Sequence, residues 1–266
     1  MNINWSYTLV GFIVGTCMAY SGVGAGAITT PLLIFLGVGS NTAIGSDLLF
    51  ALGTKIVAML THLQKRTVQF SVLWRLSLGG LPGAIIGVAI TAYLHHRYIN
   101  DINALNQILK IAVAIALLLS AAGIILNRKL SADTASRTNH VPTLQLALIG
   151  FFVGVCVSIT SIGAGSLTLP LLLLVAPSVA LRRLVGTDLA FAVVVLVPAL
   201  IGHWQIGDVN PGIAASLLIG SIPGVFIGTH FVTRLPERWF RSALAGVLIV
   251  VAIALLPILP HGHAKG

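Results

Sequence analysis

The sequence predicts an all-α polytopic membrane protein with two inverted-topology repeats, each a glycine-broken re-entrant helical hairpin plus three full spans. Its composition, an internal repeat and the distribution of Lys and Arg lead to this prediction. Of the 266 residues, 57% are hydrophobic and only 8% are charged, and the mean hydropathy is +1.02. A soluble domain carries about 25% charged residues. This chain therefore lacks the residues to build a solvated surface.

The second half of the chain repeats the first. Residues 11–31 align with residues 150–170 at an offset of 139, and residues 45–87 align with residues 186–228 at an offset of 141. Glycines, prolines, an aspartate and a histidine recur at matching positions, which indicates an internal duplication. The predicted domains are a first repeat (1–127), a linker (128–141) and a second repeat (142–266).

Each half divides into five apolar pieces. The second piece of each half has 10 residues, whereas a transmembrane helix needs about 20, and the first piece is borderline. We therefore expect the first two pieces to form a re-entrant hairpin and the other three to cross the bilayer. In chain order, the pieces are Trp5–Tyr20, Ala27–Leu36, Thr42–His62, Val72–Leu94, Ala104–Leu126, Thr143–Ile159, Ser166–Val175, Leu184–His203, Gly212–Val232 and Trp239–Leu259.

The basic residues set the orientation. One alternating topology places 11 of the 15 Lys and Arg residues on the cytoplasmic side, as the positive-inside rule requires. Corresponding loops carry these charges in one half and lack them in the other, so the halves face opposite sides. We expect a cytoplasmic linker and two extracytoplasmic termini. The net charge of +9 then reflects topology, and no nucleic-acid partner is expected.

Two glycine-rich stretches are the candidate substrate site, "SGVGAGAITTPLLIFLG" (Ser21–Gly37) and "SIGAGSLTLPLLLLVA" (Ser161–Ala176). A helix that begins after a break inside the membrane presents free N–H groups and a positive dipole end, which attract anions. The alternative is that these small residues only permit close helix packing. The predicted substrate-binding residues are Ser21, Gly22, Gly24, Ala25, Gly26, Thr29, Thr30, Ser161, Gly163, Ala164, Gly165, Ser166 and Thr168.

A few ionisable residues fall in or beside the predicted spans. Asp47 and Asp188 align and are the only acidic residues within spans; such groups are costly in a membrane and indicate function. They either carry protons or fix the glycine breaks. Lys55 has no counterpart in the second half and either pairs with an acid or attracts an anion. His62 and His203 align near span ends. They are either polar residues at the membrane interface or groups that gate transport or carry protons.

Enzyme chemistry is not expected. The spans show neither a nucleophile paired with a base nor the spacing of metal ligands, so the sequence predicts no enzyme, no catalytic residue, no metal and no cofactor. The two cysteines, Cys17 and Cys156, lie in apolar surroundings and suggest no disulfide framework.

The paired motifs resemble those of a known family. The segments "GVGAG", "TTPLL", "GSDLL" and "GGLPGAIIG", with "SIGAGSLTLPLLLL", "GTDLAF" and "GSIPGVFIGT" in the second half, are similar to the TauE/SafE family of sulfite and organosulfur-anion exporters (TSUP family). The resemblance implies a secondary transporter of the bacterial inner membrane that exports sulfite, sulfoacetate or a similar anion.

Transport by alternating access around one central site is the main hypothesis. A passive anion channel and an uptake permease for a related anion such as thiosulfate remain the alternatives. The expected partners are the lipid bilayer, the anion and, if Asp47 or Asp188 carries them, protons. The exact substrate, the direction, the coupling ion and the oligomeric state are left open by the sequence.

Overall fold

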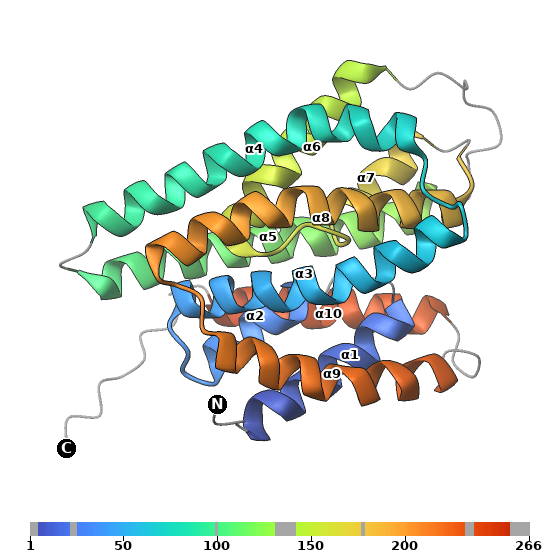
Figure 1. Cartoon of the computed structure of the whole chain (residues 1–266). Helices are drawn as coiled ribbons and strands as arrows, with labels where there is room; N and C mark the ends of the chain where they lie inside the picture. The colour runs from blue at the N-terminus through green and yellow to red at the C-terminus, as the bar shows by residue number, and fades with distance from the viewer. Residues whose placement is uncertain are drawn as a thin grey trace.

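The chain forms a bundle of α-helices (Figure 1). The computed structural model describes residues 5–21, 26–98, 101–130, 142–176, 179–231 and 237–255. These residues contain no β-strand. Their helices are α1 (Trp5–Ser21), α2 (Gly26–Phe35), α3 (Ser40–Gln64), α4 (Phe70–Arg97), α5 (Ile102–Leu130), α6 (Thr143–Thr160), α7 (Thr168–Val175), α8 (Leu181–Ile206), α9 (Pro211–Phe231) and α10 (Glu237–Leu255).

Each predicted apolar piece corresponds to one helix. The largest difference is at the end of α5, which continues to Leu130 and so includes the first residues assigned to the linker. Arg128, Lys129 and Leu130 are good helix formers, and Gly123, earlier in α5, does not end the helix. Most other helix ends differ by only a few residues. The end of the last predicted piece, residues 256–259, lies outside the described residues.

Five helices are long and apolar enough to cross a membrane, among the residues that the structure describes. They are Ser40–Gln64, Phe70–Arg97, Asn103–Ala122, Thr143–Thr160 and Arg182–Ile206. Large apolar side chains cover the outer faces of the bundle; Trp5, for example, is 81% exposed and Phe226 is 72% exposed. Such surfaces suit lipid rather than water.

Helices from the two halves pack in two matching pairs, α1 with α9 and α4 with α6. Gly79 of α4 lies against the backbone carbonyl of Ala147 on α6, and Gly220 of α9 lies against that of Thr8 on α1. A Cβ atom at either glycine would overlap the facing carbonyl. These two contacts are counterparts, because Gly79 and Gly220 are related by the offset of 141, and Thr8 and Ala147 by the offset of 139. The close packing of small residues is typical of membrane helices.

The loops after α3 and α8 also make matching contacts. The Asn210 backbone N–H donates to the Ser46 hydroxyl at 3.0 Å, and the Gln69 N–H donates to the Thr187 hydroxyl at 2.9 Å. Both pairs follow the offset of 141 with the halves exchanged. The loop after α3 therefore packs on the first turns of α8, and the loop after α8 packs on the first turns of α3.

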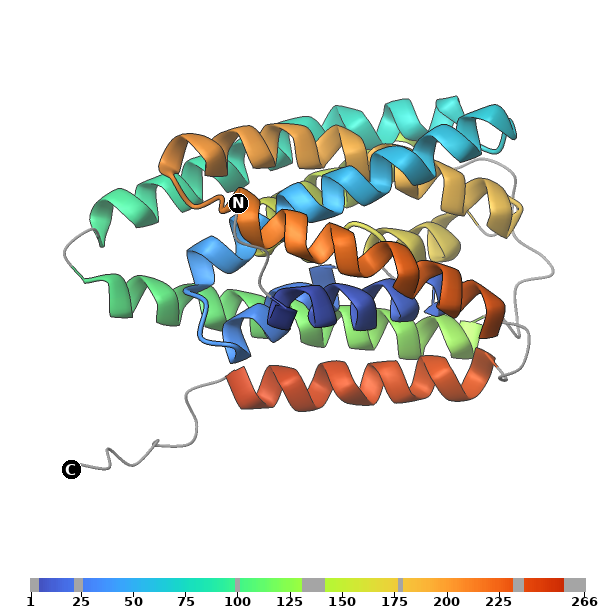
Figure 2. The ribbon, with the colours of Figure 1, turned by 60° about the horizontal axis from the view of Figure 1, so that its bottom comes forward.

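Equivalent helices run in opposite directions. In Figure 1, α3 runs from left to right and α8 from right to left, and α4 and α9 show the same reversal; Figure 2 shows both from a second side. The segment of α1 and α2 begins and ends at the left of the bundle. The segment of α6 and α7 begins and ends at the right.

Candidate functional site

The break between α6 and α7 contains three residues whose backbone has a positive φ, in the left-handed region. Ser161 has a φ of 59°, Gly163 a φ of 137° and Gly165 a φ of 97°, conformations that glycine adopts without strain. The Gly163 carbonyl accepts hydrogen bonds from the Leu167 N–H at 2.9 Å and the Thr168 N–H at 3.2 Å. Every residue from 161 to 168 is buried. The chain is thus interrupted inside the bundle and not at its surface.

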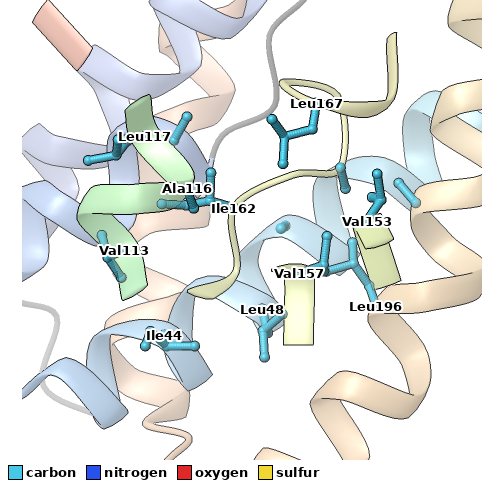
Figure 3. Close-up of a cluster of buried hydrophobic side chains, with 14 of the residues drawn as sticks. Ile44, Leu48, Val113, Ala116, Leu117, Val153, Val157, Ile162, Leu167 and Leu196 are labelled. Carbon is cyan, nitrogen blue, oxygen red and sulfur yellow. The ribbon is translucent and has the colours of Figure 1, made fainter. Parts of the chain in front are cut away.

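Apolar side chains surround this break. Figure 3 shows Ile162 and Leu167 among side chains of α3, α5, α6 and α8. Ile162 belongs to the same buried apolar cluster as Ala116 and Leu117 of α5, and all three are almost completely buried. The polar groups of the break therefore lie in surroundings of low dielectric, where hydrogen bonds and charges interact strongly.

The first half meets this break directly. Gly26, the first residue of α2, packs against the backbone carbonyl of Ser161, and a Cβ atom on Gly26 would overlap that carbonyl. The same Cβ would come within 3.0 Å of Asp47 Oδ2. The start of α2 and the end of α6 are therefore in contact, with the Asp47 carboxylate beside them.

Asp47 is fully buried on α3 and faces the start of α2. Its Oδ2 accepts a hydrogen bond from the Thr30 hydroxyl at 2.8 Å. The hydroxyls of Thr29 and Ser161 also lie next to this carboxylate. Its other oxygen, Oδ1, has no hydrogen-bond partner among the residues that the structure describes.

Asp188 has the matching position on α8. It is 3% exposed and lies next to the Thr168 hydroxyl and the Gly165 backbone N–H. Thr168 is the counterpart of Thr29, so each aspartate faces the equivalent threonine of its own half. In each half the carboxylate thus faces a donor that the sequence assigned to the substrate.

Lys55 carries the positive charge that interacts with both aspartates. It is 3% exposed, its Nζ donates to the Ala164 carbonyl at 2.9 Å, and it interacts electrostatically with both Asp47 and Asp188. Leu196, at the aligned position of α8, is fully buried. The cluster therefore contains two acids and one base.

One residue of this cluster, Ser120, was not predicted from the sequence. The Ser120 hydroxyl, on α5, lies 3.1 Å from the Ser166 hydroxyl and donates to it. Both are almost completely buried. The available signal was a hydroxyl within the apolar run "ALLLSAAG" (Ala116–Gly123), where a polar side chain needs a partner.

The two predicted histidines lie near the ends of α3 and α8. His62 Nδ1 is 2.8 Å from the Thr67 hydroxyl. His203 is fully buried, with its Nε2 2.8 Å from the Ser158 carbonyl oxygen and its Nδ1 3.4 Å from Asp208 Oδ2. Asp208 lies in the loop after α8, outside the predicted spans, yet it is 5% exposed because the loop packs on Gly45.

Part of the predicted site lies outside the described residues, namely Gly22, Gly24 and Ala25, and the side chain of Ser21 is not described either. The structure brings together Gly26, Thr29, Thr30, Asp47, Lys55, Ser161, Gly163, Ala164, Gly165, Ser166, Thr168 and Asp188. Across the described part of the chain, no group of three or more His, Cys, Asp or Glu side chains is arranged to hold a metal ion.

Comparisons with known proteins agree with this description. The family described as "Sulfite exporter TauE/SafE" matches residues 7–255. The "Probable membrane transporter protein YjnA" of Bacillus subtilis (strain 168) is 32% identical over 262 residues, covering 94% of this chain and 99% of the relative. The "Probable membrane transporter protein YunE" of the same organism is 25% identical over 268 residues, covering 93% and 95%.

A "Probable membrane transporter protein" of Xylella fastidiosa is 24% identical over 261 residues, covering 93% of this chain and 92% of the relative. No solved structure matches the chain significantly. The family match covers nearly the whole sequence, and the apolar helices fit the membrane location that the names of the relatives state. The chain therefore belongs to the TauE/SafE sulfite exporter family and is a multi-pass membrane transporter.

Proposed function

We propose that the protein is a secondary transporter that exports a small sulfur-containing anion, such as sulfite or an organosulfonate like sulfoacetate. The observation that carries the proposal is the contact of Gly26 with Ser161, because it brings the two glycine-rich stretches together beside buried hydroxyl groups. Helix starts and hydroxyls supply the N–H and O–H donors that an oxyanion needs. The family description supports the substrate class.

We propose that the two halves are inverted repeats, with residues 1–127 and 142–266 as the units and the linker between them. The opposite directions of equivalent helices and the exchanged loop contacts support this arrangement. The segments α1–α2 and α6–α7 would then be re-entrant hairpins entering from opposite sides. Inverted repeats with breaks in matching positions are typical of transporters with a site near the midplane.

The balance of buried charge bears on coupling. When both are ionised, Asp47 and Asp188 carry two negative charges against the one positive charge of Lys55, and all three are at most 3% exposed. An additional anion in a low-dielectric site would be repelled by this net negative charge. We infer that a proton binds to one aspartate together with the anion. Protonation of Asp188 would also weaken its hold on the Thr168 hydroxyl and the Gly165 N–H.

The two ends of the bundle differ in charge. Lys65 and Arg182 lie near His62 at one end, and these are residues that the topology places in the cytoplasm. The opposite end carries Asp208 beside His203. A basic cytoplasmic entrance would attract an anion from inside the cell, which supports export. We propose an inner-membrane location with both termini extracytoplasmic.

The burial of the break between α6 and α7 favours a carrier over a passive channel. All residues from 161 to 168 are buried, whereas a channel requires a continuous wet path. Alternating access would expose this site to one side at a time by moving the halves against each other.

Substrate-dependent stabilisation of the purified protein tests the substrate class. Binding to the native state raises the apparent unfolding temperature by mass action. We expect sulfite or sulfoacetate to raise it in a saturable way and chloride to leave it unchanged at equal ionic strength. Equal responses to sulfite, sulfoacetate, thiosulfate, sulfate and chloride would contradict a specific sulfur-anion site. A response to thiosulfate alone would favour the uptake-permease alternative.

A further inference from the structure

A buried histidine–aspartate pair lies outside the central cluster, where α8 ends. His203 is fully buried and Asp208 is 5% exposed. His203 Nε2 lies 2.8 Å from the Ser158 carbonyl oxygen, and Nδ1 lies 3.4 Å from Asp208 Oδ2. Neither His203 Nδ1 nor Asp208 Oδ2 has a hydrogen-bond partner among the described residues.

Both ring nitrogens of His203 therefore face oxygen acceptors. A carbonyl oxygen has no proton to give, so Nε2 must carry the hydrogen that it donates to Ser158. A neutral ring then has a lone pair on Nδ1, which faces the carboxylate. If Asp208 is ionised as well, two acceptors oppose each other in a buried site with no donor between them, which is costly.

We propose that His203 and Asp208 together bind one proton. The proton completes the contact from either side: on Nδ1 it makes an imidazolium that donates to the carboxylate, and on Oδ2 it makes a carboxylic acid that donates to Nδ1. In both forms each buried atom has a partner. One proton is gained and no other bond changes.

His95 connects this pair to the surface. Its Nδ1 lies 3.8 Å from Asp208 Oδ1, and its side chain is 29% exposed. The Asn41 amide nitrogen, from the start of α3, lies 3.4 Å from the same Nδ1. The pair therefore faces the Ser158 carbonyl from α6 and His95 from α4, and His95 in turn lies beside Asn41 of α3. Among them only His95 can exchange a proton with solvent.

The end of α6 contacts both the pair and Asp47, because the Ser158 carbonyl accepts from His203 and the Ser161 hydroxyl lies next to the Asp47 carboxylate. The Ser158 hydroxyl, one turn before Ser161, and Asp47 Oδ1 are buried without a hydrogen-bond partner in the described structure. Buried polar atoms of this kind are commonly bridged by ordered water. The end of α6 thereby offers the pair a route for proton exchange with Asp47, an extension that rests on the proposed function.

At the opposite end of the bundle, the position equivalent to Asp208 holds a threonine instead of an acid. His62 and Thr67 are the counterparts of His203 and Asp208, and the Thr67 hydroxyl lies 2.8 Å from His62 Nδ1. A hydroxyl can donate as well as accept, so this histidine needs no second proton. Lys65 and Arg182, its charged neighbours, oppose a positive ring. The proton site therefore has no counterpart at the aligned positions His62 and Thr67, and it lies at the extracytoplasmic end in the proposed topology.

Solid-state nuclear magnetic resonance of the protein in lipid vesicles tests the proposal directly. With isotope-labelled histidine, ring nitrogen shifts separate an imidazolium from a neutral ring, and His203→Gln assigns the signal. Infrared spectra of the same samples report a protonated carboxyl group, which Asp208→Asn assigns. His62→Gln is the matched control, because it removes the equivalent histidine of the other half.

An imidazolium at His203 near neutral pH that becomes neutral in Asp208→Asn supports the proposal. A neutral His203 with a carboxylic acid band that Asp208→Asn removes supports it equally. A neutral His203 together with an ionised Asp208 overturns it. Because these readouts involve no substrate, a failure of sulfite transport would leave them intact. Loss of the proton site would likewise leave an anion transporter possible.

Discussion

Gly26, the first residue of α2, packs against the backbone carbonyl of Ser161, the residue that follows the last turn of α6. The contact joins the glycine-rich stretches of the two halves, which are about 140 residues apart in sequence. It requires a residue without a side chain, because a Cβ atom would overlap the carbonyl oxygen.

Replacing Gly26 with alanine should destabilise the protein. Alanine favours a helix over glycine by about 1 kcal/mol, but overpacking against a buried backbone costs about 1–3 kcal/mol, so we expect a lower unfolding temperature. Gly246→Ala is the control, since a Cβ there meets no atom within 4 Å. Equal unfolding temperatures for the two variants would show that the breaks do not meet in this way.

Replacing Lys55 with methionine should destabilise the protein more than replacing Gly26 with alanine. The substitution keeps most of the side-chain volume and removes the only base facing Asp47 and Asp188 among the described residues. Removing one member of a buried charge cluster costs about 3–5 kcal/mol, and lower pH should restore stability by neutralising a carboxylate. Thermal unfolding over a pH series measures this. Lys110→Met, which changes a half-buried lysine of α5, should show neither effect.

Removing the Ser120 hydroxyl should weaken the contact between α5 and the break that separates α6 from α7. Ser120→Ala leaves the Ser166 hydroxyl with one partner fewer, and we expect a loss of about 1 kcal/mol. A double-mutant cycle with Ser166→Ala measures the coupling, which should be clearly above zero. Ser77→Ala is the control, because that hydroxyl bonds the Leu73 carbonyl of its own helix. Additive losses would mean that the two hydroxyls are not coupled.

The matching glycine contacts make a prediction about the repeat. Gly79→Ala and Gly220→Ala each place a Cβ in overlap with a facing carbonyl, so both should destabilise by a similar amount, about 1–3 kcal/mol. Gly53→Ala should be tolerated, since the nearest atom is a Leu218 methyl carbon at 3.5 Å. Chemical denaturation in detergent provides the comparison. A strong effect in one half and none in the other would argue against equivalent packing.

Much of the fold could be predicted because the sequence states it twice. The apolar pieces correspond to the helices, and Asp47 and Asp188 stood out as acids within apolar spans. The role of the loops could not be predicted in the same way. The loop that carries Asp208 has the composition of a solvated turn, and its burial depends on packing against Gly45. Ser120 was missed because its partner, Ser166, is 46 residues away in sequence.

Helix ends were predicted less well for a related reason. Hydropathy identifies the apolar part of a helix, but good helix formers extend it into polar sequence, as at Leu130 of α5. The pairing of Asp188 with Thr168 and Gly165 also required tertiary structure. The sequence left open whether this aspartate carries protons or fixes the break, and its neighbours allow it to do both.

The most direct test of the central claim is counterflow of radiolabelled sulfite in proteoliposomes that contain wild-type protein or Thr168→Val. We expect saturable exchange with wild-type protein. The variant, which keeps the shape of the side chain but loses the hydroxyl beside Asp188, should have a KM raised about tenfold, equivalent to about 1.4 kcal/mol for one lost hydrogen bond. Ser77→Ala should behave as wild type. Exchange no faster than in protein-free liposomes would contradict the proposed function, and an unchanged KM in Thr168→Val would contradict a site between the two breaks.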